Sequence, residues 1–191
     1  MYPVSDGFLR AVKSNTRKYY WTGTIVTKGG MTYEFGAKEI VKGSGYISRQ
    51  CCGSTEIELG TVYAAEMGIT LLSDIDRYTL EDAQVTLVFH LVLADGSVED
   101  VPMGVFEVSE ANRLAKCLEL KAYDFMLRFD KSFNGFETVG TAYDFIALCC
   151  KRCKVEFANK RAEIDAMPNG GVTLSVYTEN DIETCRDVLF Y

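Results

Sequence analysis

The sequence predicts an α+β fold, mainly an antiparallel β-barrel with a second, partial α/β domain. Up to about residue 126, runs rich in aromatic and β-branched residues alternate with glycine-containing turns, which is typical of a barrel or sandwich. From about residue 133 the apolar residues follow a helical spacing instead. We therefore expect one domain at 1–132 and the start of another at 133–191.

A short helix and a hairpin are expected first. Ser5 can cap a helix in which Phe8, Leu9 and Val12 share one face. After Asn15, the run KYYWTGTIVTK at 18–28 has strand composition, and the glycines at 29 and 30 can form a tight turn into MTYEF.

A half-buried strand is expected at about 62–72. Its apolar residues alternate with others at a period of two, which places one set on a buried face: Ala65, Met67, Ile69 and Leu71. A helix would instead place Glu66 among the apolar residues. Gly60 and Gly68 favour a kink or bulge in this strand.

An antiparallel meander should follow. Two long β-rich runs flank Asp95-Gly96, whose residues tolerate the backbone angles of a hairpin turn. A third run, LAKCLELKAYDFM, follows after EANR. Pro102 lies near the start of its strand and indicates an edge or a bulge, because proline cannot donate to the ladder.

Two helix starts are marked in the last third of the chain. Thr141 and Asp144 resemble a capping box, and the apolar residues that follow predict a helix from 142 to about 153. Thr184 and Asp187 repeat this signal, so a helix should begin at about 185. The chain ends about two turns later, and we expect it to be cut off within the second domain.

The composition favours a soluble protein that is made in the cytoplasm. The formal net charge of −7 and the scattered basic residues disfavour nucleic-acid binding, which needs a positive face. No apolar run approaches the roughly 20 residues that span a bilayer, and the N-terminus lacks the apolar stretch of a secretory signal.

The cysteines are expected to be reduced and structural. There are seven, an odd number that includes two adjacent pairs, which is not typical of a disulfide framework. Cys150 and Cys153 have the spacing of half a zinc or redox site, but no second pair matches them. Together with Cys149 they fall on the apolar face of the predicted helix. We predict no metal and no cofactor.

No catalytic residue is expected either. His90, the single histidine, shares a strand face with Val88 and Val92, and no motif marks a nucleophile near it. Asp74 and Asp76 are too few for a calcium loop, and the glycines form no phosphate-binding loop.

Three long stretches resemble the N-terminal region of tail hub proteins from phages and prophages of Gram-positive bacteria. They begin with CCGSTEIELGTVYAAEMGITLLSDIDRYTLEDAQVTLVF and continue with DGSVEDVPMGVFEVSEANR and CLELKAYDFMLRFDK. The similarity runs over most of the chain, and TAYDFIALCCKRCKVEF and ETCRDVLFY resemble the domain that follows in such proteins.

The resemblance implies a non-enzymatic structural protein of the virion. Its barrel would be of the tail-tube type, and hubs of this family are usually trimers that join the tail tube to the spike or tip around a central channel. The implied partners are therefore further copies of the chain and the tube and spike proteins, with no specific nucleic acid and no membrane.

Four residues are predicted to lie in an interface, and two other functions are alternatives to that of a tail hub. Tyr63, Glu66, Asp95 and Gly96 are the predicted interface residues. One rival is a cell-wall hydrolase or metal-dependent enzyme that uses the cysteines or Asp74 and Asp76. The other is a receptor or carbohydrate-binding module with an exposed aromatic platform formed by Tyr19, Tyr20 and Trp21.

Overall fold

The computed structural model describes residues 2–50, 63–134, 138–177 and 182–190. The chain folds into two compact units. One comprises Met1–Ser48 with Ala65–Asp124, and the other comprises Arg49–Ala64 with Phe125–Tyr191. Residues 125–132, expected in the first domain, thus group with the second unit, because Phe129 is buried in that unit's core.

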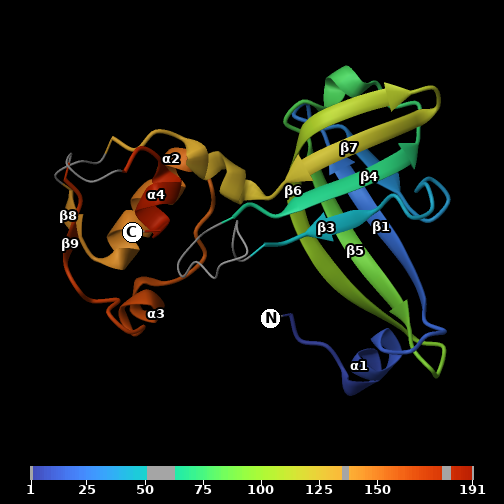
Figure 1. The fold of residues 1–191 in the computed structure, drawn as a ribbon, viewed down its shortest axis with the longest axis horizontal. Helices are drawn as coiled ribbons and strands as arrows, with labels where there is room; N and C mark the ends of the chain where they lie inside the picture. Colours follow the sequence, from blue (N-terminus) through green and yellow to red (C-terminus); the bar gives the residue numbers. More distant parts are fainter. Residues whose placement is uncertain (1, 51–62, 135–137, 178–181, 191) are drawn as a thin grey trace. The chain divides into compact units, whose positions relative to one another are not determined.

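The first unit is one seven-stranded antiparallel sheet with a short helix, α1 (Figure 1). The strands lie in the order β2-β1-β5-β6-β7-β4-β3. The elements are α1 Asp6–Val12, β1 Lys18–Val26, β2 Thr32–Phe35, β3 Tyr46–Ser48, β4 Glu66–Leu72, the 3-10 helix η1 Arg77–Leu80, β5 Gln84–Val92, β6 Val98–Leu114 and β7 Cys117–Tyr123.

The predicted hairpins are confirmed. β1 pairs with β2 through a turn in which Gly30 has φ +83°, and β5 pairs with β6 through a turn in which Gly96 has φ +84°. Glycine adopts this left-handed region without a steric penalty. The Ser5 cap of α1 is also present, since its hydroxyl accepts from the backbone N–H of Phe8 at 3.1 Å.

One apolar core lies against the inner face of this sheet. The predicted buried set is confirmed, because Ala65, just before β4, and Met67, Ile69 and Leu71 of β4 are all at most 5 % exposed. The other buried members are Leu80 of η1, Ala83 just before β5, and residues of the other strands: Ile25, Phe35, Val85, Leu87, Phe106, Val108, Leu118, Leu120 and Ala122.

Two irregularities in β6 accompany the curl of the sheet. The register with β5 shifts between Leu87 and Val88, opposite Gly104 and Pro102, and the register with β7 shifts between Val108 and Glu110. Bulges of this kind increase twist and bend a strand. The expectation that Pro102 marks a bulge is confirmed.

The expected bulge at Gly68 is wrong. β4 runs through Gly68 in unbroken register with both neighbouring strands. The glycine is needed for space instead, since a Cβ there would lie 2.3 Å from the Tyr46 ring. Gly60 lies outside the described residues. The residues EANR, which precede the third predicted run, belong to β6, and this strand continues to Leu114.

The sheet is antiparallel and curled, and with the helices it gives an α+β protein. Among the described residues β2 and β3 are its two edges and do not pair with each other, so the sheet is open. The predicted closed barrel is therefore not seen, since neither short edge strand finds a partner on its outer side.

The second unit is built around two helices, Ala142–Cys153 (α2) and Cys185–Phe190 (α4). Its elements are η2 Phe125–Asp130, β8 Val139–Gly140, α2 Ala142–Cys153, α3 Arg161–Asp165, β9 Leu174–Ser175 and α4 Cys185–Phe190. Both predicted capping pairs are confirmed: Thr141 N–H donates to Asp144 at 2.9 Å, and Thr184 N–H donates to Asp187 at 2.8 Å. The helix at 142–153 has the predicted bounds.

Candidate functional site

A hydrogen-bonded network on the outer face of the first unit joins three strands. His90 on β5 lies between Asp100 on β6 and Thr22 on β1. The distance from His90 Nδ1 to Asp100 Oδ1 is 2.6 Å, and the distance from His90 Nε2 to Thr22 Oγ1 is 2.7 Å. The His90 side chain is only 13 % exposed. This face was predicted for His90, but its two polar partners were not.

The orientation of the His90 ring is held by stacking on its face as well as by hydrogen bonds at both nitrogens. Tyr20 stacks on it with centroids 4.5 Å apart and planes 12° apart. Because an ionised carboxylate only accepts hydrogen bonds, the proton of a neutral His90 lies on Nδ1, and Nε2 accepts from the Thr22 hydroxyl. The order of groups is that of a nucleophile, a base and an orienting carboxylate.

A pocket of about 540 Å³ adjoins this network, because Thr22 lines it. Its other polar side chains are Thr24, Thr86, Glu34 and Glu39. Glu39 accepts a hydrogen bond from the N–H of Gly36 at 2.9 Å, which holds the chain after β2 in a turn. The pocket therefore combines hydroxyls and carboxylates on one side of the sheet.

The predicted interface residue Glu66 lies in a polar cluster on β3, β4 and β7. It accepts from the Tyr46 hydroxyl at 2.6 Å and pairs with Lys121 at 3.3 Å. The Tyr46 hydrogen bond is the main cause that lowers the pKa of Glu66. Tyr123 and Glu66 together raise the pKa of Lys121.

Asp95 and Gly96 form the β5–β6 turn, as predicted. Asp95 Oδ1 accepts from the Ser97 hydroxyl at 2.6 Å and from the Ser97 N–H at 3.0 Å, and the hydroxyl is the main cause that lowers the pKa of Asp95. Glu66 and Asp95 are not brought together, since the ladder links Glu66 through Tyr123 and Glu107 to the other end of β5. Tyr63 is half-buried and belongs to the second unit.

Four cysteines meet in the core of the second unit. Cys149, Cys150 and Cys153 lie on the buried face of α2, as predicted, and Cys185 joins them from α4. Burial, followed by the neighbouring Cys185, raises the pKa of Cys149 to about 12 and that of Cys153 to about 11. Such thiols remain protonated and poorly reactive at neutral pH. Cys51 and Cys52 lie outside the described residues.

No metal site is found in the part of the chain that the structure describes. Within it, no three side chains among histidine, cysteine, aspartate and glutamate are grouped so that they could hold an ion. Asp76 caps η1 instead, where its carboxylate accepts from the N–H of Tyr78 at 3.1 Å. Asp74 is exposed on the preceding loop.

The aromatic platform expected for a carbohydrate-binding module is not formed. Tyr19 and Trp21 contact Phe89 on the inner face of the sheet, whereas Tyr20 stacks on His90 on the outer face. Successive residues of a strand point to opposite faces, so three in a row cannot share one surface.

No helix among the described residues has the length and apolar character needed to cross a membrane. No protein-family model matches the chain, and no curated protein matches it. Among solved structures, one match is a chain described as "Virion of native gene transfer agent (GTA) particle", with 14% sequence identity and a TM-score of 0.39. The match covers 62% of this chain and 44% of that chain, so this chain spans less than half of it.

Proposed function

We propose that the chain is a structural component of a phage or prophage tail. In this proposal it is a baseplate or tail-tip hub protein that joins the tail tube to the spike or tip and lines the channel through which DNA passes. The observation that carries the proposal is the resemblance of residues 51–89, 95–113 and 117–131 to the N-terminal region of tail hub proteins.

The form of the sheet supports this role. A strongly curled antiparallel sheet with one core and two free edges is suited to a tube wall, because edge strands carry backbone groups that a neighbouring chain can pair with. We propose that β2 and β3 complete a tail-tube-like barrel wall in this way within a ring, and that the protein is a trimer.

The acidic balance of the chain supports a channel-lining role. A net charge of −7 gives a surface that repels the phosphate backbone, so that DNA can slide through the channel without binding.

Solution mass is the first test of this proposal. Light scattering of the purified protein at several concentrations should give a trimer or larger ring, and negative-stain images should show annular particles. A chelator should leave the mass unchanged. A monomer at every concentration would contradict self-assembly, and a chelator-dependent mass would point to a metal-dependent protein.

A second candidate, a glycan-binding or cell-wall-hydrolysing accessory domain, is favoured by the pocket beside Thr22 and His90. Three threonine hydroxyls and two carboxylates line it, groups that hydrogen-bond sugars readily. Binding on a glycan array, or turnover of purified peptidoglycan that is lost in His90→Gln, would favour this candidate. If neither occurs, the hub proposal stands alone.

A further inference from the structure

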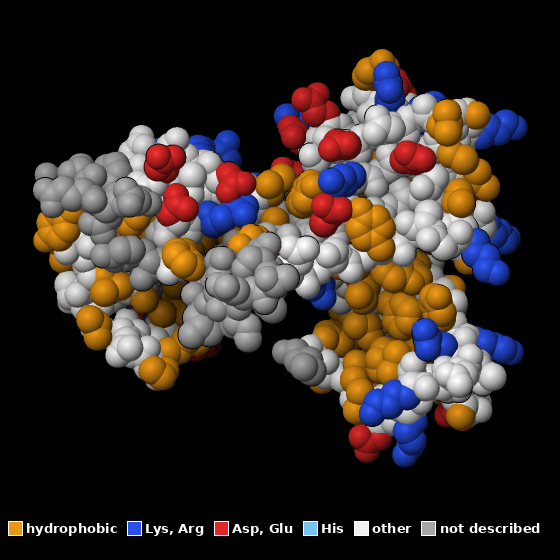
Figure 2. Space-filling view, in the orientation of Figure 1, with side chains coloured by type: hydrophobic (Ala, Val, Ile, Leu, Met, Phe, Trp, Pro, Cys, Tyr) orange, Lys and Arg blue, Asp and Glu red, His pale blue; other side chains and the backbone are white. Residues whose placement is uncertain are grey.

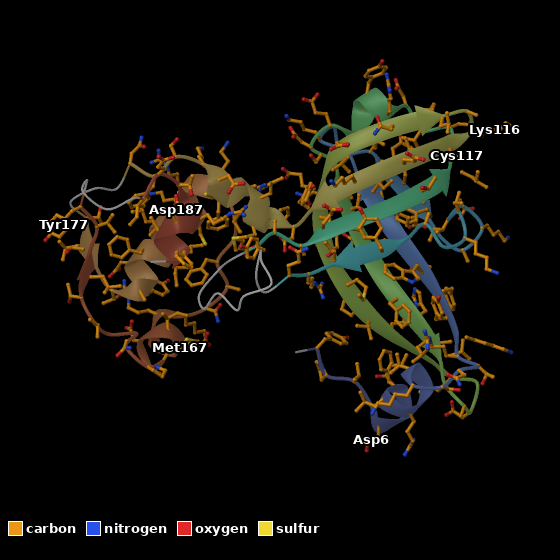
Figure 3. The ribbon with its side chains drawn as sticks, in the orientation of Figure 1. Asp6, Lys116, Cys117, Met167, Tyr177 and Asp187 are labelled. Atoms are coloured by element: carbon orange, nitrogen blue, oxygen red, sulfur yellow. The ribbon has the colours of Figure 1, made fainter. Side chains whose placement is uncertain are left out.

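Two of the clustered cysteines lie at the ends of two packed helices. Cys153 is the last residue of α2, and Cys185 is the first residue of α4. Figure 3 shows α4, on which Asp187 is labelled, against α2. Both thiols are free in the structure, and both belong to the buried core of the second unit. The fold thus brings together two thiols that are far apart in the chain.

Hydrogen bonds to the segment 131–132 hold both helix ends. The N–H of Cys185 donates to the carbonyl oxygen of Lys131 at 2.9 Å. Arg152 Nε donates to the carbonyl oxygen of Ser132 at 2.8 Å, and Lys131 Nζ donates to the carbonyl oxygen of Arg152 at 3.3 Å. The thiol of Cys153, the next residue, lies in hydrogen-bonding contact with that of Cys185. Two sulfurs in contact are the arrangement from which a disulfide forms.

Cys149 also contacts Cys185, but its position makes it less suited to react. It lies about one turn inside α2 and is 0% exposed, whereas Cys153 at the end of the helix is 5% exposed. The last turn of a helix opens more readily than its interior, because it has fewer hydrogen bonds to break. Cys153 is therefore the thiol of this pair that a small reagent reaches first.

The charges around Cys153 also favour its ionised form. Lys and Arg side chains lie among Asp and Glu on the face of the second unit that Figure 2 shows. Burial raises the pKa of Cys153 to about 11, and the positive charge of Lys131 opposes this rise. Burial raises the pKa of Cys149 further, to about 12. The thiolate is the form that attacks a disulfide, so this difference acts in the same direction as exposure.

We propose that Cys153 and Cys185 form a disulfide when the protein meets an oxidant of the low-molecular-weight disulfide class. The Cys153 thiolate, which has lost its proton to solvent, attacks one sulfur of the small disulfide, whose S–S bond breaks and releases one small thiolate. The Cys185 thiolate then attacks the sulfur of Cys153 and releases the second small thiolate. Both leaving groups take up a proton, so two cysteine thiols lose two electrons and the small disulfide becomes two thiols.

This bond acts as a redox switch on the second unit. It ties the end of α2 to the start of α4 and closes the loop 154–184, which restricts the unfolded chain. Thiols stay reduced inside most cells and are oxidised outside them. A protein that is made in a cell and then released would gain the bond after release. The chemistry itself does not depend on the proposed function.

The test maps the disulfides of the full chain. The reduced protein is incubated in native buffer with excess oxidised glutathione, its remaining thiols are alkylated, and its peptides are identified by mass spectrometry. Cys153 and Cys185 should be recovered in one crosslinked peptide, from a band that runs as a single chain on a non-reducing gel. In calorimetry the transition of the second unit should rise by about 5 °C or more, and dithiothreitol should reverse this shift.

Three variants make the test specific. Cys153→Ala and Cys185→Ala should each lose both the crosslink and the shift of the transition. Cys150→Ala is the matched control, because Cys150 is on the same helix and is 7% exposed, close to the 5% of Cys153. It should still form the crosslink. The peptide map of the wild type needs no variant, so the test does not depend on how the variants fold.

Several results would overturn the inference. A bond from Cys185 to Cys149 or Cys150 would show that the pairing is wrong. Glutathione attached separately to Cys153 and to Cys185 would show that the two sulfurs do not reach each other. Free thiols at both positions, under conditions that oxidise the denatured chain, would show that the folded unit does not form the bond. All of these results leave the assembly role untouched, since light scattering tests it separately.

Discussion

At the scale of single residues, His90 contributes more than packing. It connects β1, β5 and β6 by two hydrogen bonds on the outer face, on the opposite side of the sheet from the apolar core that the described residues form. A partly buried polar group stabilises only while its partners are present, because each unpaired member keeps its desolvation cost.

We expect Thr22→Val to destabilise the first unit by about 1 kcal/mol, since the isosteric change leaves His90 Nε2 without its partner. Thr24→Val is the control, because Thr24 lies two residues along on the same face of β1. Urea unfolding of both variants measures the difference. Equal midpoints would show that the hydrogen bond contributes nothing.

A pair of adjacent glycines in the second unit should respond in opposite ways. A Cβ on Gly170 would lie 2.0 Å from the carbonyl oxygen of Ile164, and this backbone atom cannot move aside. A Cβ on Gly171 would meet nothing within 4 Å. Gly170→Ala should therefore cost about 3 kcal/mol or more, whereas Gly171→Ala should be neutral or slightly stabilising. Thermal unfolding of the two variants tests this contrast.

At the scale of elements, the start of α2 is stabilised by a capping carboxylate, that of Asp144. Asp144 accepts from Arg161 and from both the N–H and the hydroxyl of Thr141, and these bonds lower its pKa well below the usual range. A lowered folded-state pKa gives stability that is present above the unfolded value near 3.8 and is lost as the pH falls below it.

Asp144→Asn should therefore lower the stability of the second unit at neutral pH and weaken its dependence on pH below about 4. Denaturant unfolding at neutral and acidic pH measures both effects. Glu156→Gln, which removes an exposed carboxylate from the same unit, should leave the acid sensitivity as it is in the wild type. An unchanged pH profile in Asp144→Asn would show that the Asp144 cap contributes nothing to the loss of stability at acidic pH.

Local signals in the sequence predicted these elements well. Contacts between segments that are far apart in the chain could not be predicted from the sequence. The capping pairs, the glycine turns and the alternation in β4 depend on neighbours within a few residues, so they can be read from the chain. The partners of His90 come from strands 68 residues before it and 10 residues after it. Cys185 meets the α2 cysteines through tertiary packing that no spacing reveals, and the space required at Gly68 depends on Tyr46 from another strand.

At the scale of the whole molecule, the described residues form two separate buried cores. The first is enclosed by the sheet, and the second by η2, α2 and α4. Each core belongs to one unit, so we expect each unit to unfold as its own cooperative transition.

Core substitutions should identify the two transitions in calorimetry. Leu118→Ala removes a fully buried side chain from the first core and should cost about 2–5 kcal/mol in that transition alone. Cys149→Ser places a hydroxyl in the second core and should lower only the other transition. A single transition that both substitutions shift would show that the units unfold together.

The cluster of Cys149, Cys150, Cys153 and Cys185 can be used to measure how often the second unit opens locally. A thiol reagent cannot reach these buried groups until the helices part, so its rate of reaction measures how often α2 and α4 separate under native conditions. The second unit thus carries its own reporters of local opening, without any added label.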